Sequence, residues 1–137
     1  MDTLDRFIRA QDGHYEQALA ELRAGRKSSH WIWFVLPQLR GLGRSPMALA
    51  YGITGRVEAQ AYLDHPVLGE RLRTCVQALL AHTGRSAVDV LGDIDAMKCR
   101  SCLTLFDAMS PSADNVFNEA LHAFYGGEPD AATLALL

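Results

Sequence analysis

Apolar residues recur at helical spacing along most of this chain, and residues that end a helix interrupt the pattern at short intervals. The clearest segment begins at Pro66 and reaches about His82. Its apolar positions would form one wide stripe on a helix, made of Leu68, Leu72, Cys75, Val76, Leu79 and Leu80. A half-buried strand would need strict alternation of apolar and polar residues, which no long segment shows. The sequence therefore predicts short helices that pack on one another.

Start and stop signals divide the rest of the chain into similar segments. Helices are predicted over residues 3–11, 14–24, 46–51, 56–63, 66–82, 93–109, 112–125 and 130–137, with one further turn after residue 86. The expected N-caps are Ser45, Ser86, Asp93, Ser112 and Asp130. The resulting prediction is a mainly α fold, a compact single-domain array of about eight short helices over residues 1–137.

The segment of residues 28–37 can be interpreted in two ways. A serine cap before Trp31 favours a helix, whereas the short aromatic and β-branched run fits a buried strand equally well. Pro37 disfavours helical geometry at Leu36. A short helix is the preferred prediction for residues 31–36, and the strand stays open as the alternative.

Composition and charge exclude several classes of protein. A chain of 137 residues with 49% hydrophobic and 21% charged residues can bury one core and is not disordered. The formal net charge is −3 and basic residues form no run, which argues against a nucleic-acid partner. Binding of nucleic acid would need four arginines to cluster on one face, namely Arg40, Arg44, Arg71 and Arg73.

The same sequence gives no sign of a membrane segment. The longest apolar run, residues 31–37, is too short to span a bilayer, so no membrane partner is expected. The N-terminal residues are charged and do not resemble a signal peptide. The expected location is therefore cytoplasmic.

Cysteine and histidine spacing indicates neither a metal site nor a cofactor. The three cysteines, Cys75, Cys99 and Cys102, are odd in number, and the last two lack the second pair that a zinc site needs. The five histidines do not show the spacing of metal-binding motifs. We expect the cysteines to be small core residues.

Both tryptophans of the chain, Trp31 and Trp33, follow directly after His30. A histidine beside apolar surface can act as a general acid or base near neutral pH, and an indole can form the wall of a ligand site. Lys27 and Gln38 flank this run and would add charge and polar contacts. The alternative is a core segment whose histidine bonds a nearby carbonyl group, which is the commoner arrangement for these residue types.

The loop of residues 40–46 reads Arg-Gly-Leu-Gly-Arg-Ser-Pro. Glycines allow the backbone to approach an anion, and Arg40 and Arg44 could hold a phosphate group. The spacing matches neither a P-loop nor a dinucleotide-binding motif. The loop is a candidate anion site, and an ordinary surface turn is the more frequent alternative.

A third candidate group lies in the predicted helix of residues 93–109. Lys98 shares a helix face with apolar residues, so it is expected to point inward with Ser101 beside it. A buried lysine must be paired or lose its charge, and Asp95 lies three residues earlier, within pairing reach on a helix. The alternative is a lysine that extends its ammonium group to water.

Several sequence blocks together resemble one known family. They read K-x-S-H-W-x-W-F-x-x-P-Q-L-R-G-L-G over residues 27–43, A-Y-L-x-H-P-x-L-G over 61–69, D-x-x-K-x-R-S over 95–101 and D-x-x-T-L over 130–134. The chain is similar over nearly its whole length to the bacterial domain-of-unknown-function 1810 family, which implies a mainly helical fold and supplies no established activity. Some members carry the label calpastatin, but calpastatins are disordered inhibitors and this composition is globular.

The chain departs from that family in one block. Family members resemble Lys-Leu-Arg-Ser-Ser-Met-Thr-Leu-Phe there, whereas this chain has Cys99, Cys102 and Leu103 in place of the Leu, the second Ser and the Met. A role that belonged to the second serine would therefore be absent from this chain.

These observations lead to two hypotheses. The first is a pocket for a small anionic or nucleotide-like ligand, with hydrolysis as a candidate reaction and His30, Lys98 and Ser101 as catalytic residues. The ligand-binding residues would be Lys27, Trp31, Trp33, Gln38, Arg40 and Asp95. The second is a protein-interaction or regulatory module without chemistry, which predicts an exposed apolar patch. The pocket hypothesis requires His30 and Lys98 to face one cavity, and the oligomeric state is open in both.

Overall fold

The computed structural model describes residues 3–137, and that range contains ten helices. They are α1 (Asp5–Gln11), α2 (Tyr15–Ala24), α3 (Ile32–Val35), α4 (Pro46–Tyr51), α5 (Arg56–Asp64), α6 (Leu68–Leu80), α7 (Ala87–Leu91), α8 (Asp93–Ala108), α9 (Val116–Tyr125) and α10 (Ala131–Leu136). The predicted mainly α fold is confirmed. The count exceeds eight because the short turns α3 and α7 are separate helices.

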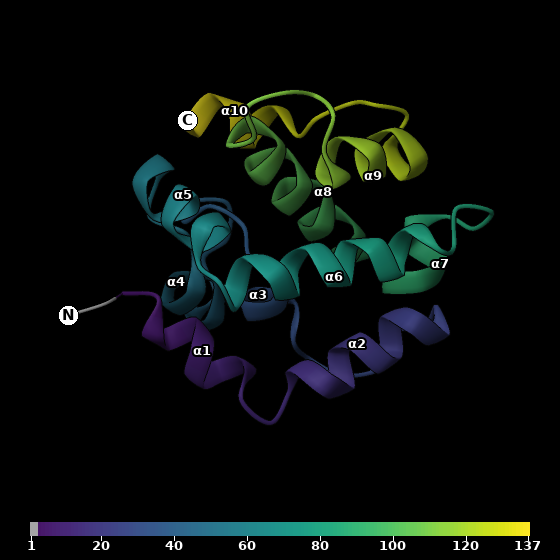
Figure 1. The fold of residues 1–137 in the computed structure, drawn as a ribbon, viewed down its shortest axis with the longest axis horizontal. Coiled ribbons are helices and arrows are strands. Elements are labelled where there is room, and N and C mark those ends of the chain that lie inside the picture. Colours follow the sequence, from purple (N-terminus) through teal and green to yellow (C-terminus); the bar gives the residue numbers. More distant parts are fainter. Residues whose placement is uncertain (1–2) are drawn as a thin grey trace.

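Helix α6 runs through the middle of the molecule and organises its neighbours (Figure 1). It contacts α2 on one side and α5 and α9 on others, and α8 packs on α9 and α7. The wide apolar stripe predicted for this helix explains its place, since Leu68, Leu72, Cys75, Val76 and Leu79 are all buried in one continuous core. The stripe faces several partners at once because it covers more than one side of the helix.

The segment of residues 31–36 forms a short helix, so the preferred prediction is confirmed and the strand alternative is wrong. Within residues 3–137 the extended backbone forms only an isolated parallel bridge between Leu39 and Ile53. The Arg40 N–H donates to the Ile53 carbonyl at 2.8 Å, and the Ile53 N–H donates to the Gln38 carbonyl at 2.9 Å. These bonds fix both ends of the segment that carries the 40–46 loop.

Side-chain caps define several helix starts. Ser45, Ser86 and Asp130 each accept a hydrogen bond from the backbone N–H three residues later, as predicted. The prediction that Ser112 caps α9 is wrong, because Asn115 takes that position and accepts from Asn118. The prediction for Asp93 is also wrong, since Gly92 at φ 87° occupies the N-cap of α8.

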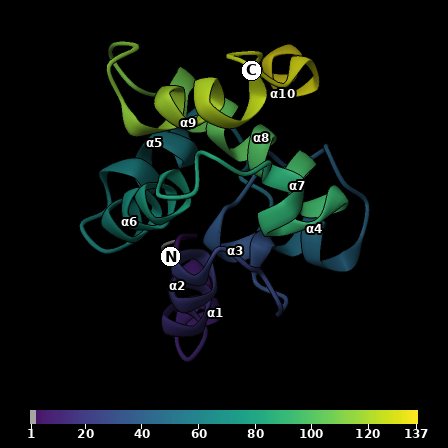
Figure 2. The same ribbon diagram turned by 90° about the vertical axis from the view of Figure 1, so that its right-hand side faces the viewer.

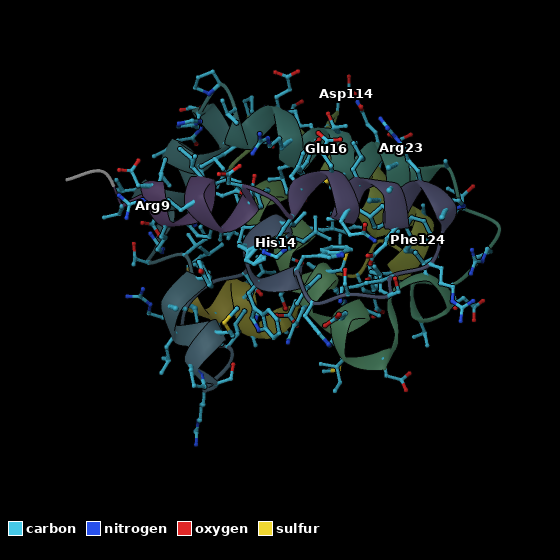
Figure 3. The ribbon with its side chains drawn as sticks, turned by 90° about the horizontal axis from the view of Figure 1, so that it is seen from below. Arg9, His14, Glu16, Arg23, Asp114 and Phe124 are labelled. Carbon is cyan, nitrogen blue, oxygen red and sulfur yellow. The ribbon has the colours of Figure 1, made fainter. Side chains whose placement is uncertain are left out.

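Polar contacts join the N-terminal helix α1 to the rest of the molecule. Figure 3 shows α1 and α2 along one face, with His14 between them. Arg6 on α1 holds both carboxylate oxygens of Glu58 on α5, at 2.6 and 3.0 Å. Gln11 is buried and donates to the Phe34 carbonyl at 2.7 Å and to the Tyr62 hydroxyl at 3.1 Å. Helix α1 is therefore tied to both α3 and α5.

In residues 3–137, no helix combines the length and the apolar character that crossing a bilayer requires.

Candidate functional site

Two adjoining hollows lie where α8 meets the segment before α4, on the side of the molecule opposite α5 and α6. Figure 2 shows α4, α7, α8 and α10 toward this side. The first hollow encloses about 420 Å³ and is lined by Gln38, Leu42, Gly43, Arg44, Ser45, Ala48, Ile94, Met97, Lys98, Ser101, Asp130 and Ala132. The second encloses about 510 Å³ and is lined by His30, Trp33, Leu91, Gly92, Asp93, Ile94, Asp95 and Lys98. Lys98 and Ile94 belong to both hollows.

The Lys98 side chain stands between the two hollows and is 23% exposed. Its ammonium nitrogen lies 4.7 Å from the centre of the Trp33 ring and 3.9 Å from Oδ1 of Asp95. The predicted pairing with Asp95 is therefore present but long. A cation over an indole face keeps its charge and gains a modest attraction, so Lys98 offers a largely unneutralised positive charge to both hollows.

Asp95 makes its shorter ion pair with Lys27. The Lys27 ammonium lies 2.6 Å from Oδ2 of Asp95, donates to the Ser29 carbonyl at 2.6 Å, and sits 4.9 Å from the centre of the Trp31 ring. Only 6% of the Lys27 side chain is exposed. Lys27 therefore joins the 27–31 segment to α8 and lines neither hollow.

Glu21 on α2 organises the backbone that presents His30. Its buried carboxylate accepts the Ser28 and Ser29 N–H groups at 2.7 and 3.0 Å and the Trp31 indole N–H at 3.0 Å. The Ser29 hydroxyl and the Gln17 amide donate to its other oxygen. Burial alone would raise the pKa of Glu21, but these hydrogen bonds outweigh it and hold the pKa well below its ordinary value.

Trp31 and Trp33 have different environments. Trp31 is 1% exposed, its N–H is bound to Glu21, and it belongs to the core. Trp33 is half-buried and lines the second hollow. Its indole nitrogen is the only buried side-chain polar atom of residues 3–137 that lacks a hydrogen-bond partner. The atom is closed to solvent, and an unmet buried donor of this kind costs about 1–3 kcal/mol.

The first hollow collects polar side chains that have no protein partner for their donors. The Gln38 amide, the Arg44 guanidinium group and the Ser45 hydroxyl proton make no hydrogen bond or ion pair to any residue of 3–137. The Ser45 oxygen itself accepts from the Ala48 N–H at 3.1 Å. Together with Lys98, these groups give the hollow two positive charges and four sets of donors on one concave surface.

Ser101 lines the same hollow but is already bonded. Its hydroxyl group lies 3.3 Å from Oδ2 of Asp130 and 3.3 Å from the Met97 carbonyl. The same Asp130 oxygen accepts from the N–H and hydroxyl of Thr133 at 2.9 and 2.5 Å, which caps α10. In this structure Ser101 contributes to the contact between α8 and the start of α10.

His30 is exposed at the edge of the second hollow. Its imidazole makes no hydrogen bond to any residue that the structure describes. The carbonyl partner expected if it were a core histidine is therefore missing. Both nitrogens are available to a ligand or to water.

The structure thus gathers most of the predicted site residues, in two groups. Gln38, Lys98 and Ser101 line the first hollow, and His30, Trp33, Asp95 and Lys98 line the second. Lys27, Trp31 and Arg40 line neither. Arg40 instead borders a separate hollow beside α1, with Arg6 and Arg9.

Four contributing residues were not among the predicted site residues, namely Arg44, Ser45, Glu21 and Asp130. Arg44 and Ser45 belong to the loop predicted as an anion candidate, and their position directly before α4 places them at the hollow. Glu21 and Asp130 act by supporting other residues, and no local sequence signal relates Glu21 to the segment that it binds. A glutamate on an otherwise buried helix face could have indicated such a role.

The cysteines are core residues, as predicted. Cys75, Cys99 and Cys102 are buried and unpaired. Burial raises the pKa of the Cys75 and Cys99 thiols to about 12, which leaves them without nucleophilic thiolate at neutral pH. No group of three or more potential metal ligands occurs among residues 3–137.

Comparison with known proteins extends the sequence resemblance. The family model "Protein of unknown function (DUF1810)" matches residues 1–137. The chain shares 48% sequence identity with the conserved hypothetical protein Rv1873 from Mycobacterium tuberculosis. Its structure matches the crystal structure of that protein with a TM-score of 0.95. That match covers 98% of this chain and 95% of the other. No curated protein matches the chain.

Proposed function

This chain belongs to the DUF1810 family, whose function is unknown, and we propose from its own residues that it binds a small anionic molecule in the first hollow. The observation that carries the proposal is the set of donors there, three without a protein partner and Lys98 with only a long ion pair. Gln38, Arg44 and Ser45 from the segment between α3 and α4 and Lys98 from α8 converge on one concavity. Gln38 and Lys98 are half-buried, whereas Arg44 and Ser45 are exposed at the rim, and the convergence of these donors on one concavity supports an external acceptor.

Charge and size support the same ligand class. Arg44 and Lys98 bring two positive charges, while the one acidic residue of the wall, Asp130, is committed to capping α10. A volume of about 420 Å³ falls in the usual range for small-molecule sites. The remaining wall is apolar, with Leu42, Ala48 and Met97, so the ligand has an uncharged part as well.

Hydrolysis would use the adjoining hollow. His30 is free to take a proton from a water molecule, and Lys98 lies between the two hollows, where it can stabilise developing negative charge. Ser101 already donates its hydroxyl proton within the protein, so on this proposal it holds the wall in place and water is the nucleophile.

One observation favours a second candidate function, a protein-interaction module. Ile94 and Met97 are 70% and 73% exposed at the mouth of the first hollow. Exposed apolar side chains of this size beside a cavity are typical of surfaces that a partner covers. A partner that presents a carboxylate or phosphate group would use the same donors.

The two arginines of the 40–46 loop give a matched test. Arg44→Met and Lys98→Met should each weaken anion binding about tenfold or more, because charge-assisted hydrogen bonds are worth about 1.5–3 kcal/mol. Arg40→Met removes the same charge from the same loop but lies outside the hollow, so it should leave affinity unchanged. Titration calorimetry and thermal denaturation with phosphate, sugar phosphates, nucleoside monophosphates and medium-chain carboxylates measure the effect.

Ligand at about 100 times its dissociation constant should add about 2.7 kcal/mol to the unfolding free energy. Equal weakening by Arg40→Met and Arg44→Met would mean diffuse attraction rather than a site and would contradict the proposal. No binding by any member of the panel would favour the interaction module.

A further inference from the structure

The second hollow adjoins the proposed anion site but has a different chemistry. The two hollows share Lys98 and Ile94, so the Lys98 side chain borders both. A ligand that filled only the first hollow would leave about 510 Å³ beside its charged group. The residues of that second space show what it can accept.

Acceptors dominate the second hollow. The Asp93 carboxylate is exposed and makes no hydrogen bond or ion pair with any residue that the structure describes, and the His30 imidazole is also unpartnered. Asp95 is already neutralised by Lys27 at 2.6 Å. The free carboxylate makes this hollow unsuitable for a second anionic group, but it suits hydroxyl groups, which donate to carboxylate and imidazole acceptors.

The donors of the first hollow favour phosphate over carboxylate. Four separate side chains, Gln38, Arg44, Ser45 and Lys98, present donors to that space. A carboxylate presents its acceptors on two oxygens in one plane, whereas a terminal phosphate group presents three oxygens that point in different directions and can meet donors spread around a concave wall.

We propose that the ligand is a phosphate ester of a polyhydroxylated group, bound with its phosphate in the first hollow, its hydroxyl groups in the second, and Lys98 at the junction. This inference rests on the proposed anion site and deepens it. On this arrangement, His30 and Asp93 select the organic part of the ligand and do not contribute to the affinity for the phosphate itself.

The test compares two probes, inorganic phosphate and ribose 5-phosphate, by titration calorimetry or by phosphorus NMR for weak binding. In the wild-type protein, ribose 5-phosphate should bind about tenfold tighter than inorganic phosphate, since two hydroxyl contacts are added. His30→Ala and Asp93→Ala should each bring that ratio closer to one, without weakening the binding of inorganic phosphate.

Asp89→Ala is the matched control for Asp93→Ala. It removes the same charge from the neighbouring helix α7 and lines neither hollow, so the ratio should stay at its wild-type value. Circular dichroism of each variant verifies that the fold is intact.

The two proposals fail in different ways. If inorganic phosphate binds and is weakened by Arg44→Met, but ribose 5-phosphate has no advantage or keeps it in both His30→Ala and Asp93→Ala, the anion site stands and the two-part ligand is wrong. If neither probe binds, the anion site itself is wrong and this inference fails with it.

Discussion

At the scale of single residues, the division of Asp95 between two lysines determines the charge of the candidate site. Oδ2 of Asp95 holds Lys27 at 2.6 Å, while Oδ1 is 3.9 Å from Lys98. The interaction of two charges falls with distance and with solvent access, so the buried pair takes most of the attraction. The positive charge of Lys98 therefore remains available to the hollows, because Lys27 pairs more closely with Asp95.

Glu21 lines neither hollow, but its substitution should disturb the candidate site strongly. Its carboxylate accepts hydrogen bonds from the Ser28, Ser29 and Trp31 donors in a buried position. In Glu21→Gln, the amide nitrogen cannot accept, so the two donors at one oxygen lose their partner and the remaining hydrogen bonds lose the charge that strengthens them. We expect the free energy of unfolding to fall by about 2–4 kcal/mol, measured by urea denaturation.

Glu16→Gln is the control for that change, because Glu16 is exposed on the same helix. It should alter the free energy of unfolding by less than about 0.5 kcal/mol. Similar values for the two variants would show that Glu21 does not hold the 28–31 segment in place.

At the scale of helices, local signals predicted most starts and ends because capping acts within one turn. Ser45, Ser86 and Asp130 cap the helices that were assigned to them, and Gly25 ends α2 in the left-handed conformation. The prediction for Ser112 is wrong because Asn115, three residues later, offers an equally good side-chain acceptor. Local preference alone cannot choose between two suitable caps on the same approach to a helix.

The close contact between α5 and α6 depends on Gly69, whose role is in helix packing and not in capping. A Cβ atom at Gly69 would lie 2.1 Å from the Leu63 carbonyl oxygen, so the backbone of one helix would have to move. Gly69→Ala should therefore destabilise the protein by about 1–3 kcal/mol or more, seen as a lower melting temperature.

Gly84→Ala provides the comparison, since a Cβ atom there meets nothing within 4 Å and the φ angle lies outside the left-handed region. This change should be neutral or stabilising by up to about 1 kcal/mol, because alanine restricts the unfolded chain. A melting temperature for Gly69→Ala equal to that of Gly84→Ala would contradict the close approach of the two helices.

At the scale of the whole molecule, two buried carboxylates make stability depend on pH. Burial raises the pKa of Glu58, but hydrogen bonds from Arg6 and Thr54 and the Arg6 charge outweigh it and lower the pKa to about 2. The pKa of Glu21 is lowered as well. Both groups bind protons more readily in the unfolded chain, so the stability that they provide is complete above about pH 4.3 and is lost as the pH falls toward 2.

We expect the free energy of unfolding to decline steeply between about pH 4.3 and pH 2, and the decline to be shallower in Glu58→Gln. Glu70→Gln, an exposed acid on α6, should keep the wild-type slope. Urea denaturation across this pH range measures both slopes. A wild-type slope in Glu58→Gln would mean that the Arg6–Glu58 pair does not control acid stability.

The sequence by itself determined the helices of this protein, its buried cysteines and the short list of polar residues from which the site is built. These features depend on periodicity, on caps within one turn and on residue type, all of which act between neighbours in the chain. The 40–46 loop was identified as an anion candidate in this way, with Arg40 and Arg44 as equal contributors.

Only the tertiary structure decided which of those residues meet. It placed Arg44 at the hollow and Arg40 beside α1, buried Trp31 against Glu21, and paired Lys27 with an aspartate on α8. Each outcome depends on how helices distant in the sequence pack, and packing chooses among side chains that are chemically alike. The direction in which a lysine or an arginine points is therefore set by its distant neighbours rather than by its own segment.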